Sequence, residues 1–215
     1  MGDATHPAGF DWARPSRATP DDPLRVLFSA CLLGHPTGWE GGAYTEEIAV
    51  RLAGLPCVRA VHFCPENATL GTPRPLTTLH GGHGGDVLAG RARVLETTGR
   101  DVTRELVRGA EAMLAVARRE GAELAVLLDV SDSCGSHVVY LGDPVERRYQ
   151  KGPGVAAALL LDAGVPVLAQ RDHATMQRLL AALDPTFAPD PAAFDFVEHP
   201  WYRDYFADGD PARRR

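Results

Sequence analysis

The stretch LRVLFSACLLG (residues 24–34) joins a short apolar strand to a turn that begins at Cys31. Its first part is rich in Leu, Val and Phe and is too short for an ordinary buried helix. The next segment, YTEEIAVRLAG (residues 44–54), holds helix-forming residues and ends on a glycine, which favours a helix end. Together the two segments predict a β-strand followed by an α-helix.

The same alternation of strand and helix continues toward residue 184. Further strands are predicted at VRAVHF (58–63), ELAVLLDV (123–130) and VPVLAQ (165–170), and further helices at 101–122, 152–164 and 174–184. Alternating elements of this kind form a parallel sheet through right-handed crossovers, with helices covering both faces. The sequence therefore predicts an α/β, three-layer Rossmann-like domain with a mostly parallel sheet.

Three segments lie outside this alternation. Residues 1–23 are rich in proline and lack apolar periodicity, so we expect an irregular N-terminal arm before the α/β domain at 24–185. Residues 186–215 form an aromatic and charged C-terminal appendage. Within the domain, glycine and proline from residue 65 to about residue 90 predict one long loop, and loops of that length are usually functional or disordered.

Composition limits the class of partner. The net charge of −6 and the pI near 5.7 argue against electrostatic capture of a nucleic acid polymer or an anionic membrane surface. The chain has no apolar run long enough to span a bilayer and no hydrophobic segment typical of a secretory signal. We therefore expect a cytoplasmic protein that acts on a small molecule; no pattern specifies an oligomeric state.

Cysteines follow three of the predicted strands. Cys31 and Cys64 come directly after their strands, and Cys134 lies in SDSCGS, just beyond another strand. Because ligands collect at the carboxyl ends of parallel strands, these three thiols are expected to meet at one edge of the sheet. In a cytosolic chain, such cysteines are better explained as ligands or catalysts than as disulfides. Cys57 precedes a strand, at the opposite end, and is interpreted as a structural thiol.

Three thiolates are compatible with several kinds of site. They could bind zinc, act as a redox relay, or hold a cubane iron–sulfur cluster with one iron free of protein ligands. A single catalytic cysteine is a further alternative, in which one thiol matters and two do not. Electron-transfer clusters ordinarily use four cysteines, so a set of three favours an open position where a substrate binds.

The chain resembles the bacterial thiouracil desulfurases, long catalogued as a domain of unknown function. The resemblance runs in order through eight motifs between residues 24 and 170: SACLLG (29–34), WEGG (39–42), FCPE (63–66), PRP (73–75), GGDVLAG (84–90), GRDVTRELVRGA (99–110), SDSCGS (131–136) and KGPGVAAALLLDAGVPV (151–167). None of these strings is decisive alone, but their shared order makes a chance similarity improbable.

The resemblance implies a [4Fe–4S] cluster with three cysteine ligands, Cys31, Cys64 and Cys134, and one open iron. It implies a non-redox reaction in which that iron takes the thiocarbonyl sulfur of thiouracil or a related thio-base or thionucleoside, and hydrosulfide is released. Glu66 looks like the glutamate that assists the attacking water, and Ser131 or Ser133 looks like the serine beside it. A non-catalytic iron–sulfur or metal-binding module, which stores or senses sulfur or iron, is the alternative function.

This sequence departs from the family pattern near the expected pocket. Asp132 stands in SDSCG where proline is common, and Asp129 stands where a lysine is expected. Because an added carboxylate repels phosphate, we hypothesise that a neutral base or nucleoside is preferred to a nucleotide.

Other residues have more than one interpretation. HGGHGG (residues 80–85) is interpreted as a flexible loop over the site, from which His83 could touch substrate. Arg74 would bind an anion in the pocket or pair with a surface carboxylate. The aromatic segment FDFVEHPWYRDYF (residues 194–206) would serve as a lid, a dimer contact or a self-packed appendage.

Overall fold

Four short apolar strands build the central sheet of the computed structural model, which describes residues 7–142 and 146–209. They are β1 (Leu24–Ser29), β2 (Val58–Phe63), β5 (Leu124–Leu127) and β8 (Val167–Ala169). All neighbouring pairs are parallel, in the order β2-β1-β5-β8. Strands β5 and β8 are wholly buried, as expected for parallel strands covered on both faces, whereas β2 is the partly exposed edge.

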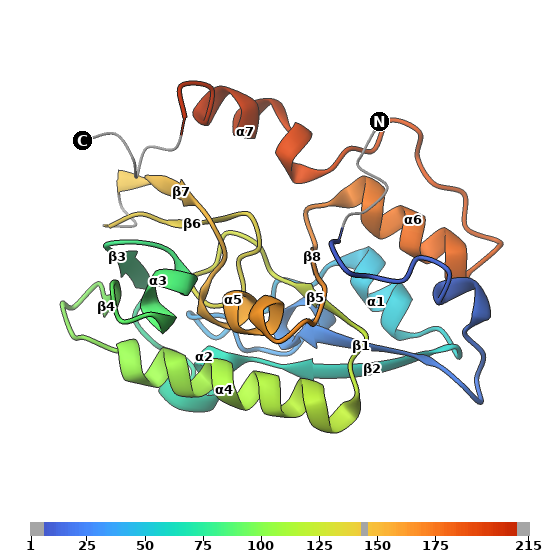
Figure 1. Cartoon of the computed structure of the whole chain (residues 1–215), viewed down its shortest axis with the longest axis horizontal. Coiled ribbons are helices and arrows are strands. Elements are labelled where there is room, and N and C mark those ends of the chain that lie inside the picture. Colours follow the sequence, from blue (N-terminus) through green and yellow to red (C-terminus); the bar gives the residue numbers. More distant parts are fainter. Residues whose placement is uncertain (1–6, 143–145, 210–215) are drawn as a thin grey trace.

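Helices cover the two faces of this sheet, which confirms the predicted three-layer α/β class (Figure 1). One face packs against α4 (Thr103–Glu120) and α5 (Val155–Asp162), and the other packs against α1 (Glu47–Ala53) and α6 (His173–Leu183). Successive strand residues alternate between the two cores: Leu27 belongs to the first, and Val26 and Phe28 belong to the second.

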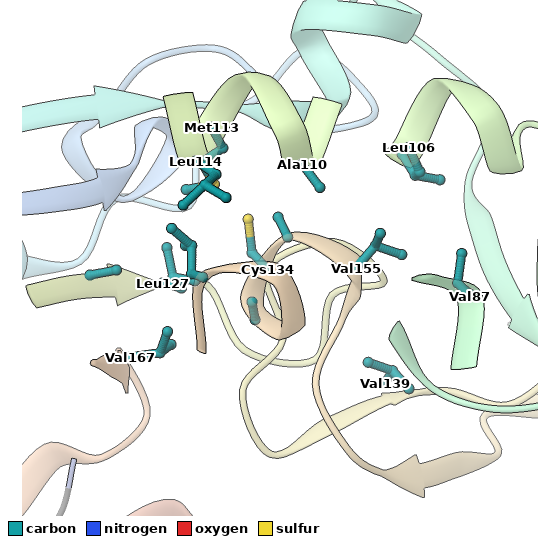
Figure 2. Packing of buried hydrophobic residues seen from close by; sticks show 14 of the residues in the cluster. Val87, Leu106, Ala110, Met113, Leu114, Leu127, Cys134, Val139, Val155 and Val167 are labelled. Atoms are coloured by element: carbon teal, nitrogen blue, oxygen red, sulfur yellow. The ribbon is translucent and has the colours of Figure 1, made fainter. Parts of the chain in front are cut away.

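Helix α4 is the longest, and its sequence explains its placement. Its buried residues recur at helical spacing and face the sheet; they are Leu106, Gly109, Ala110, Met113, Leu114 and Ala117. The helix ends at Gly121, whose φ of 62° is the left-handed conformation that glycine adopts most easily. Figure 2 shows the side chains of Met113, Leu114 and Ala110 above Leu127, Cys134 and Val155.

The prediction of one long loop between residues 65 and 90 is wrong. The structure has α2 (Pro65–Leu70), β3 (Thr77–His80) and α3 (Gly84–Leu88) there, and β3 pairs antiparallel with β4 (Arg93–Glu96). Each element is too short to show a full hydrophobic period. Pro65 occupies the first turn of α2 and Gly84 the first position of α3, so residues that resembled loop punctuation begin helices.

A second hairpin and several short helices complete the description. They are β6 (Val138–Tyr140) paired antiparallel with β7 (Tyr149–Lys151), the 3₁₀ turns η1 (Pro15–Arg17), η2 (Ala30–Leu33) and η4 (Phe196–Glu198), and α7 (Pro200–Tyr205). Figure 1 shows α7 passing over β6 and β7. Among the helices that the structure describes, none combines the length and apolar character needed to cross a membrane.

The described part of the N-terminal segment packs on the domain. Arg14 donates a hydrogen bond from Nε to Glu123 Oε1 at 2.7 Å, and the guanidinium of Arg178 lies 3.7 Å from the ring centre of Trp12. The ends of the predicted arm and appendage, residues 1–6 and 210–215, lie outside the described residues. The division into arm, domain and appendage stays a prediction.

Candidate functional site

The three cysteines that follow strands line one cavity of about 420 Å³. Cys31 lies in η2 after β1, Cys64 immediately precedes α2 after β2, and Cys134 lies in the loop after β5. Strand β1 stands between β2 and β5, so the chain runs to opposite sides of β1 in its successive crossovers. Open α/β sheets bind ligands at such a switch point, beyond the carboxyl ends of the strands.

Cys64 and Cys134 have different surroundings. Cys64 caps α2: its Sγ accepts the Asn67 backbone N–H at 3.4 Å, and it also lies 3.7 Å from the Thr37 carbonyl oxygen. Cys134 is buried in the hydrophobic core, below the side chains of α4 (Figure 2). A backbone N–H directed at sulfur stabilises thiolate and tunes a bound metal group.

Burial raises the pKa of all three thiols, and a neighbouring cysteine adds to the effect at Cys31 and Cys134. Burial, followed by the charges of Cys64 and Glu66, raises the pKa of Cys31 to about 12. The pKa of Cys134 is raised well above its usual value by burial first and then by Cys64. Burial also raises the pKa of Cys64, which Glu66 reinforces and Arg74 opposes. Thiols that affect one another in this way are near neighbours, and a cation among them would draw them into the thiolate form.

Glu66 is the centre of a hydrogen-bond network in the same cavity. Arg74 donates to its Oε2 from Nε at 2.9 Å and from Nη2 at 2.8 Å, while the Ser133 hydroxyl donates to Oε1. The side chains of Arg74 and Glu66 are 5% and 15% exposed, so the ion pair is shielded from water. Two donors on one oxygen fix the carboxylate in one orientation.

The two candidate serines have different surroundings. Both line the cavity, but only Ser133 contacts Glu66. The hydroxyl oxygen of Ser131 accepts the backbone N–H of Cys134 at 3.2 Å, which is a hydrogen bond within its own turn. Ser133 is therefore the serine whose position suits assistance to Glu66, and Ser131 shapes the cysteine turn.

The chain turns sharply from β5 into this cysteine loop. Val130, which lines the cavity, has a φ of 53°, a conformation that a β-branched residue rarely adopts. Gly154, at the start of α5, lies so close to the loop that a Cβ there would be 2.6 Å from the carbonyl carbon of Ser133. The absence of a side chain at Gly154 therefore lets α5 pack directly against the loop that carries Cys134.

Asp129 and Asp132, the two departures from the family pattern, line the cavity, and both carboxylates accept hydrogen bonds from other residues of the chain. Asp129 Oδ1 accepts the backbone N–H groups of Ser136 at 2.8 Å and His137 at 3.1 Å. Asp132 accepts a hydrogen bond from Thr77 Oγ1 at 3.3 Å, and burial raises the pKa of its carboxyl well above the usual value. The preference for a neutral base or nucleoside over a nucleotide stays a prediction.

HGGHGG is not an irregular loop. His80 ends β3, and the side chain of His83 caps α3 by accepting the Gly85 backbone N–H at 3.1 Å. Neither histidine is among the residues that line the cavity, and contact between His83 and substrate stays a prediction. Arg74 was expected to bind an anion in the pocket or to pair with a surface carboxylate. It pairs with a carboxylate, but this is Glu66, which lines the cavity.

Aromatic residues form another part of the cavity wall. Tyr140 and Tyr149 come from the second hairpin, and Phe196 and Trp201 come from the C-terminal segment. The sequence signal for these residues was the cluster FDFVEHPWYRDYF, for which a lid was one of three interpretations. The contribution of the hairpin had no sequence signal.

The donor set fits an iron–sulfur cluster. Cys57 packs beside the opposite core, with its Sγ 3.8 Å from the Leu183 carbonyl oxygen, so the cavity has three thiols and no fourth. Within residues 7–142 and 146–209, no three His, Cys, Asp or Glu side chains are arranged to hold one metal ion. Cysteine thiolates are the usual ligands of iron–sulfur clusters, so Cys31, Cys64 and Cys134 are the residues that would hold one.

Comparison with known proteins gives concordant results. The sequence model of a family described as 2-thiouracil desulfurase matches residues 26–172. The chain is 35% identical over 148 residues to the uncharacterized protein YbbK of Bacillus subtilis (strain 168), covering 68% of this chain and 96% of YbbK. Its fold matches the solved structure of the [4Fe-4S]-dependent thiouracil desulfidase TudS (DUF523Vcz) with a TM-score of 0.60 and 32% identity, covering 73% of this chain and 97% of TudS.

Proposed function

Because this chain belongs to the 2-thiouracil desulfurase family and is a desulfurase, we propose that it removes sulfur from a small thio-base or thionucleoside with a bound [4Fe–4S] cluster. The reaction exchanges the thiocarbonyl sulfur for the oxygen of one water molecule and releases hydrosulfide. The carbon–sulfur double bond breaks, a carbonyl forms, and no electron is gained or lost. The observation that carries the proposal is a single cavity lined by three thiols and by the Glu66–Ser133 pair.

Cys31, Cys64 and Cys134 would hold the cluster. When bound, the cluster supplies a soft iron with an affinity for thiocarbonyl sulfur. Since Cys57 is packed at the other end of the sheet, that iron would have no cysteine ligand from this cavity. The Asn67 N–H at Cys64 Sγ would stabilise the thiolate that ligation requires.

Glu66 would remove a proton from the attacking water. Its Oε2 is occupied by the two hydrogen bonds from Arg74, which leaves Oε1 as the oxygen available for proton transfer. Ser133 donates to that same Oε1, so its hydroxyl is placed to orient the water beside the carboxylate. Arg74 contributes by holding the carboxylate in a fixed direction.

The cavity suits a small molecule. A volume of about 420 Å³ lies in the range of ordinary small-ligand sites. Its lining combines the thiols with apolar and aromatic side chains, which matches a planar, largely apolar ring that carries one reactive sulfur. We therefore include a thiolated base or nucleoside in the proposal and exclude a nucleic acid polymer.

The alternative, a module that stores or senses iron or sulfur, gives no role to the network at Glu66. A store or sensor needs ligands for its metal group, but it needs no carboxylate oriented by both an arginine and a serine. The hydrogen-bond network at Glu66 therefore favours an enzyme over a storage or sensing module.

Anaerobic reconstitution tests the proposal. The protein should become brown and bind about four irons and four labile sulfides per chain, and it should release hydrosulfide from 2-thiouracil. Ser substitution at Cys31, Cys64 or Cys134 should abolish both iron binding and turnover, whereas Cys57→Ser should retain both. A colourless, iron-free protein after reconstitution, or equal loss in Cys57→Ser, would overturn the proposal.

A further inference from the structure

The C-terminal segment FDFVEHPWYRDYF (residues 194–206) reaches the same cavity as the cysteines. It contains η4 and α7 and crosses the second hairpin (Figure 1). Two of its aromatic residues, Phe196 and Trp201, line the cavity together with Tyr140 and Tyr149. The match to the family model ends at residue 172, so this part of the wall belongs to a region that the family model does not cover.

The segment is fixed to the domain by buried hydrogen bonds. Asp195 accepts the backbone N–H of Thr175 at 2.9 Å and its hydroxyl at 2.6 Å. The Phe196 N–H donates to Asp172 Oδ1 at 3.1 Å, and the Tyr205 hydroxyl oxygen accepts the Tyr149 N–H at 2.8 Å. Because both ends of the segment are anchored, its rings hold a defined position at the cavity.

Four of the aromatic rings that line the cavity form a continuous surface, which we call the aromatic wall: Tyr140, Tyr149, Phe196 and Trp201. The ring centres of Tyr140 and Tyr149 are 5.3 Å apart, those of Tyr149 and Trp201 are 5.2 Å apart, and those of Phe196 and Trp201 are 5.9 Å apart. The planes of Phe196 and Trp201 are inclined by only 19°. Trp201 also stacks on Tyr205, with ring centres 5.2 Å apart and planes inclined by 21°. Aromatic rings at the side of a cavity can bind another planar ring by offset stacking or by edge-to-face contact.

We propose that the aromatic wall is the subsite that binds the heteroaromatic ring of the substrate, with Trp201 as its main contact. The inference rests on the proposed function and deepens it, because it selects cyclic thio-bases over acyclic thioamides. Glu66 and the three cysteines line the same cavity, so a ring bound at the wall can present its sulfur to them. Stacking of one base on an aromatic side chain changes affinity by roughly 10- to 100-fold.

Binding of 2-thiouracil measured by calorimetry, with every protein in a Glu66→Gln background that should keep the cluster but not consume the substrate, tests the subsite. In the reconstituted protein, Trp201→Ala should raise the Kd for 2-thiouracil roughly 10- to 100-fold, and Trp201→Phe should restore most of the affinity. Trp12→Ala is the matched control, since Trp12 packs against the opposite core. Iron content should be the same in all four proteins, because the aromatic wall holds no cluster ligand.

Two results would overturn the subsite: unchanged affinity in Trp201→Ala, or a Trp201→Phe variant that binds as weakly as Trp201→Ala. Failure of the proposed function looks different. If the Trp201 variants show the expected affinities but the wild-type protein releases no hydrosulfide from 2-thiouracil, the subsite stands and desulfuration of 2-thiouracil is rejected. If the wild-type protein releases hydrosulfide but Trp201 does not affect binding, desulfuration stands and the subsite is rejected.

Discussion

Arg74 and Glu66 form a shielded ion pair in which two guanidinium nitrogens share one carboxylate oxygen, at 2.8 and 2.9 Å. The arrangement leaves the second oxygen of Glu66 to Ser133. Arg74 thus fixes the direction of the carboxylate, and Ser133 binds its other oxygen. The proposed role of Glu66 depends on both contacts.

Replacing Glu66 by Gln should remove catalysis and spare the cluster. The amide keeps the size of the side chain but cannot accept a proton, so kcat for hydrosulfide release should fall about 10²- to 10⁴-fold. Iron content should stay at the wild-type value. Glu111→Gln, on the exposed side of α4, is the control and should behave as wild type. A Glu66→Gln enzyme with normal turnover would eliminate this residue as the base.

The two serines should separate in function. Ser133→Ala removes a hydrogen bond to a charged group and should lower kcat about 10- to 100-fold, with little change in iron content. Ser131→Ala loses the hydrogen bond within the cysteine turn, so it should reduce cluster stability more than kcat per bound cluster. Comparing turnover normalised to iron distinguishes the two, and the reverse order would contradict the assignment.

The ion pair should be visible in a double-mutant cycle of stability. Arg74→Met leaves a shielded carboxylate without its partner and should lower the free energy of unfolding by about 3 kcal/mol. The combination with Glu66→Gln should be less harmful than the sum of the single changes, with a coupling of about 1 kcal/mol or more. Urea unfolding measures all three variants. Arg59→Met, at an exposed ion pair, is a control that should have little effect.

Helix α4 should be sensitive to a single added methyl group near the site. A Cβ at Gly109 would lie 2.3 Å from the carbonyl oxygen of Pro65, between Cys64 and Glu66. Gly109→Ala should therefore displace α2, lower the free energy of unfolding by about 1–3 kcal/mol and reduce iron binding, although alanine is the better helix former. The control Ala115→Gly, on the exposed face of α4, should cost about 1 kcal/mol and retain the iron.

Stability should depend on pH through His137. Its Nε2 lies 2.8 Å from Oδ2 of the fully buried Asp172. Burial lowers the pKa of His137, but the hydrogen bond and charge of Asp172, with Asp129 and Asp195, outweigh burial and raise it overall. A pKa raised on folding adds stability that is complete below the unfolded pKa and is lost as pH rises through the folded pKa.

The difference in urea midpoint between wild type and His137→Gln should therefore shrink from pH 5.5 to pH 9. Substitution of the exposed His173 by Gln should give a difference that does not follow this trend. Equal effects of His137→Gln at both pH values would show that the ion pair does not contribute in the charged form.

The fold could be predicted because its signals are local. Apolar strands such as Leu24–Ser29, and the periodic helix Thr103–Glu120, carry their patterns in consecutive residues. The elements between residues 65 and 90 could not be predicted from the sequence. Helices of five or six residues and a strand of four are too short to show a hydrophobic period, and their glycines and prolines are typical of loops.

The candidate site divides in the same way. By itself, the sequence determined the alternating α/β order and the position of Cys31, Cys64 and Cys134 after strands, and therefore their meeting at one edge of the sheet. Only the tertiary structure decided that Ser133 contacts Glu66 across 67 positions of the chain. It also decided that Arg74 serves this carboxylate and that Trp201 reaches the cavity. The physical reason is that strand and helix patterns depend on neighbouring residues, whereas these contacts depend on how distant segments pack.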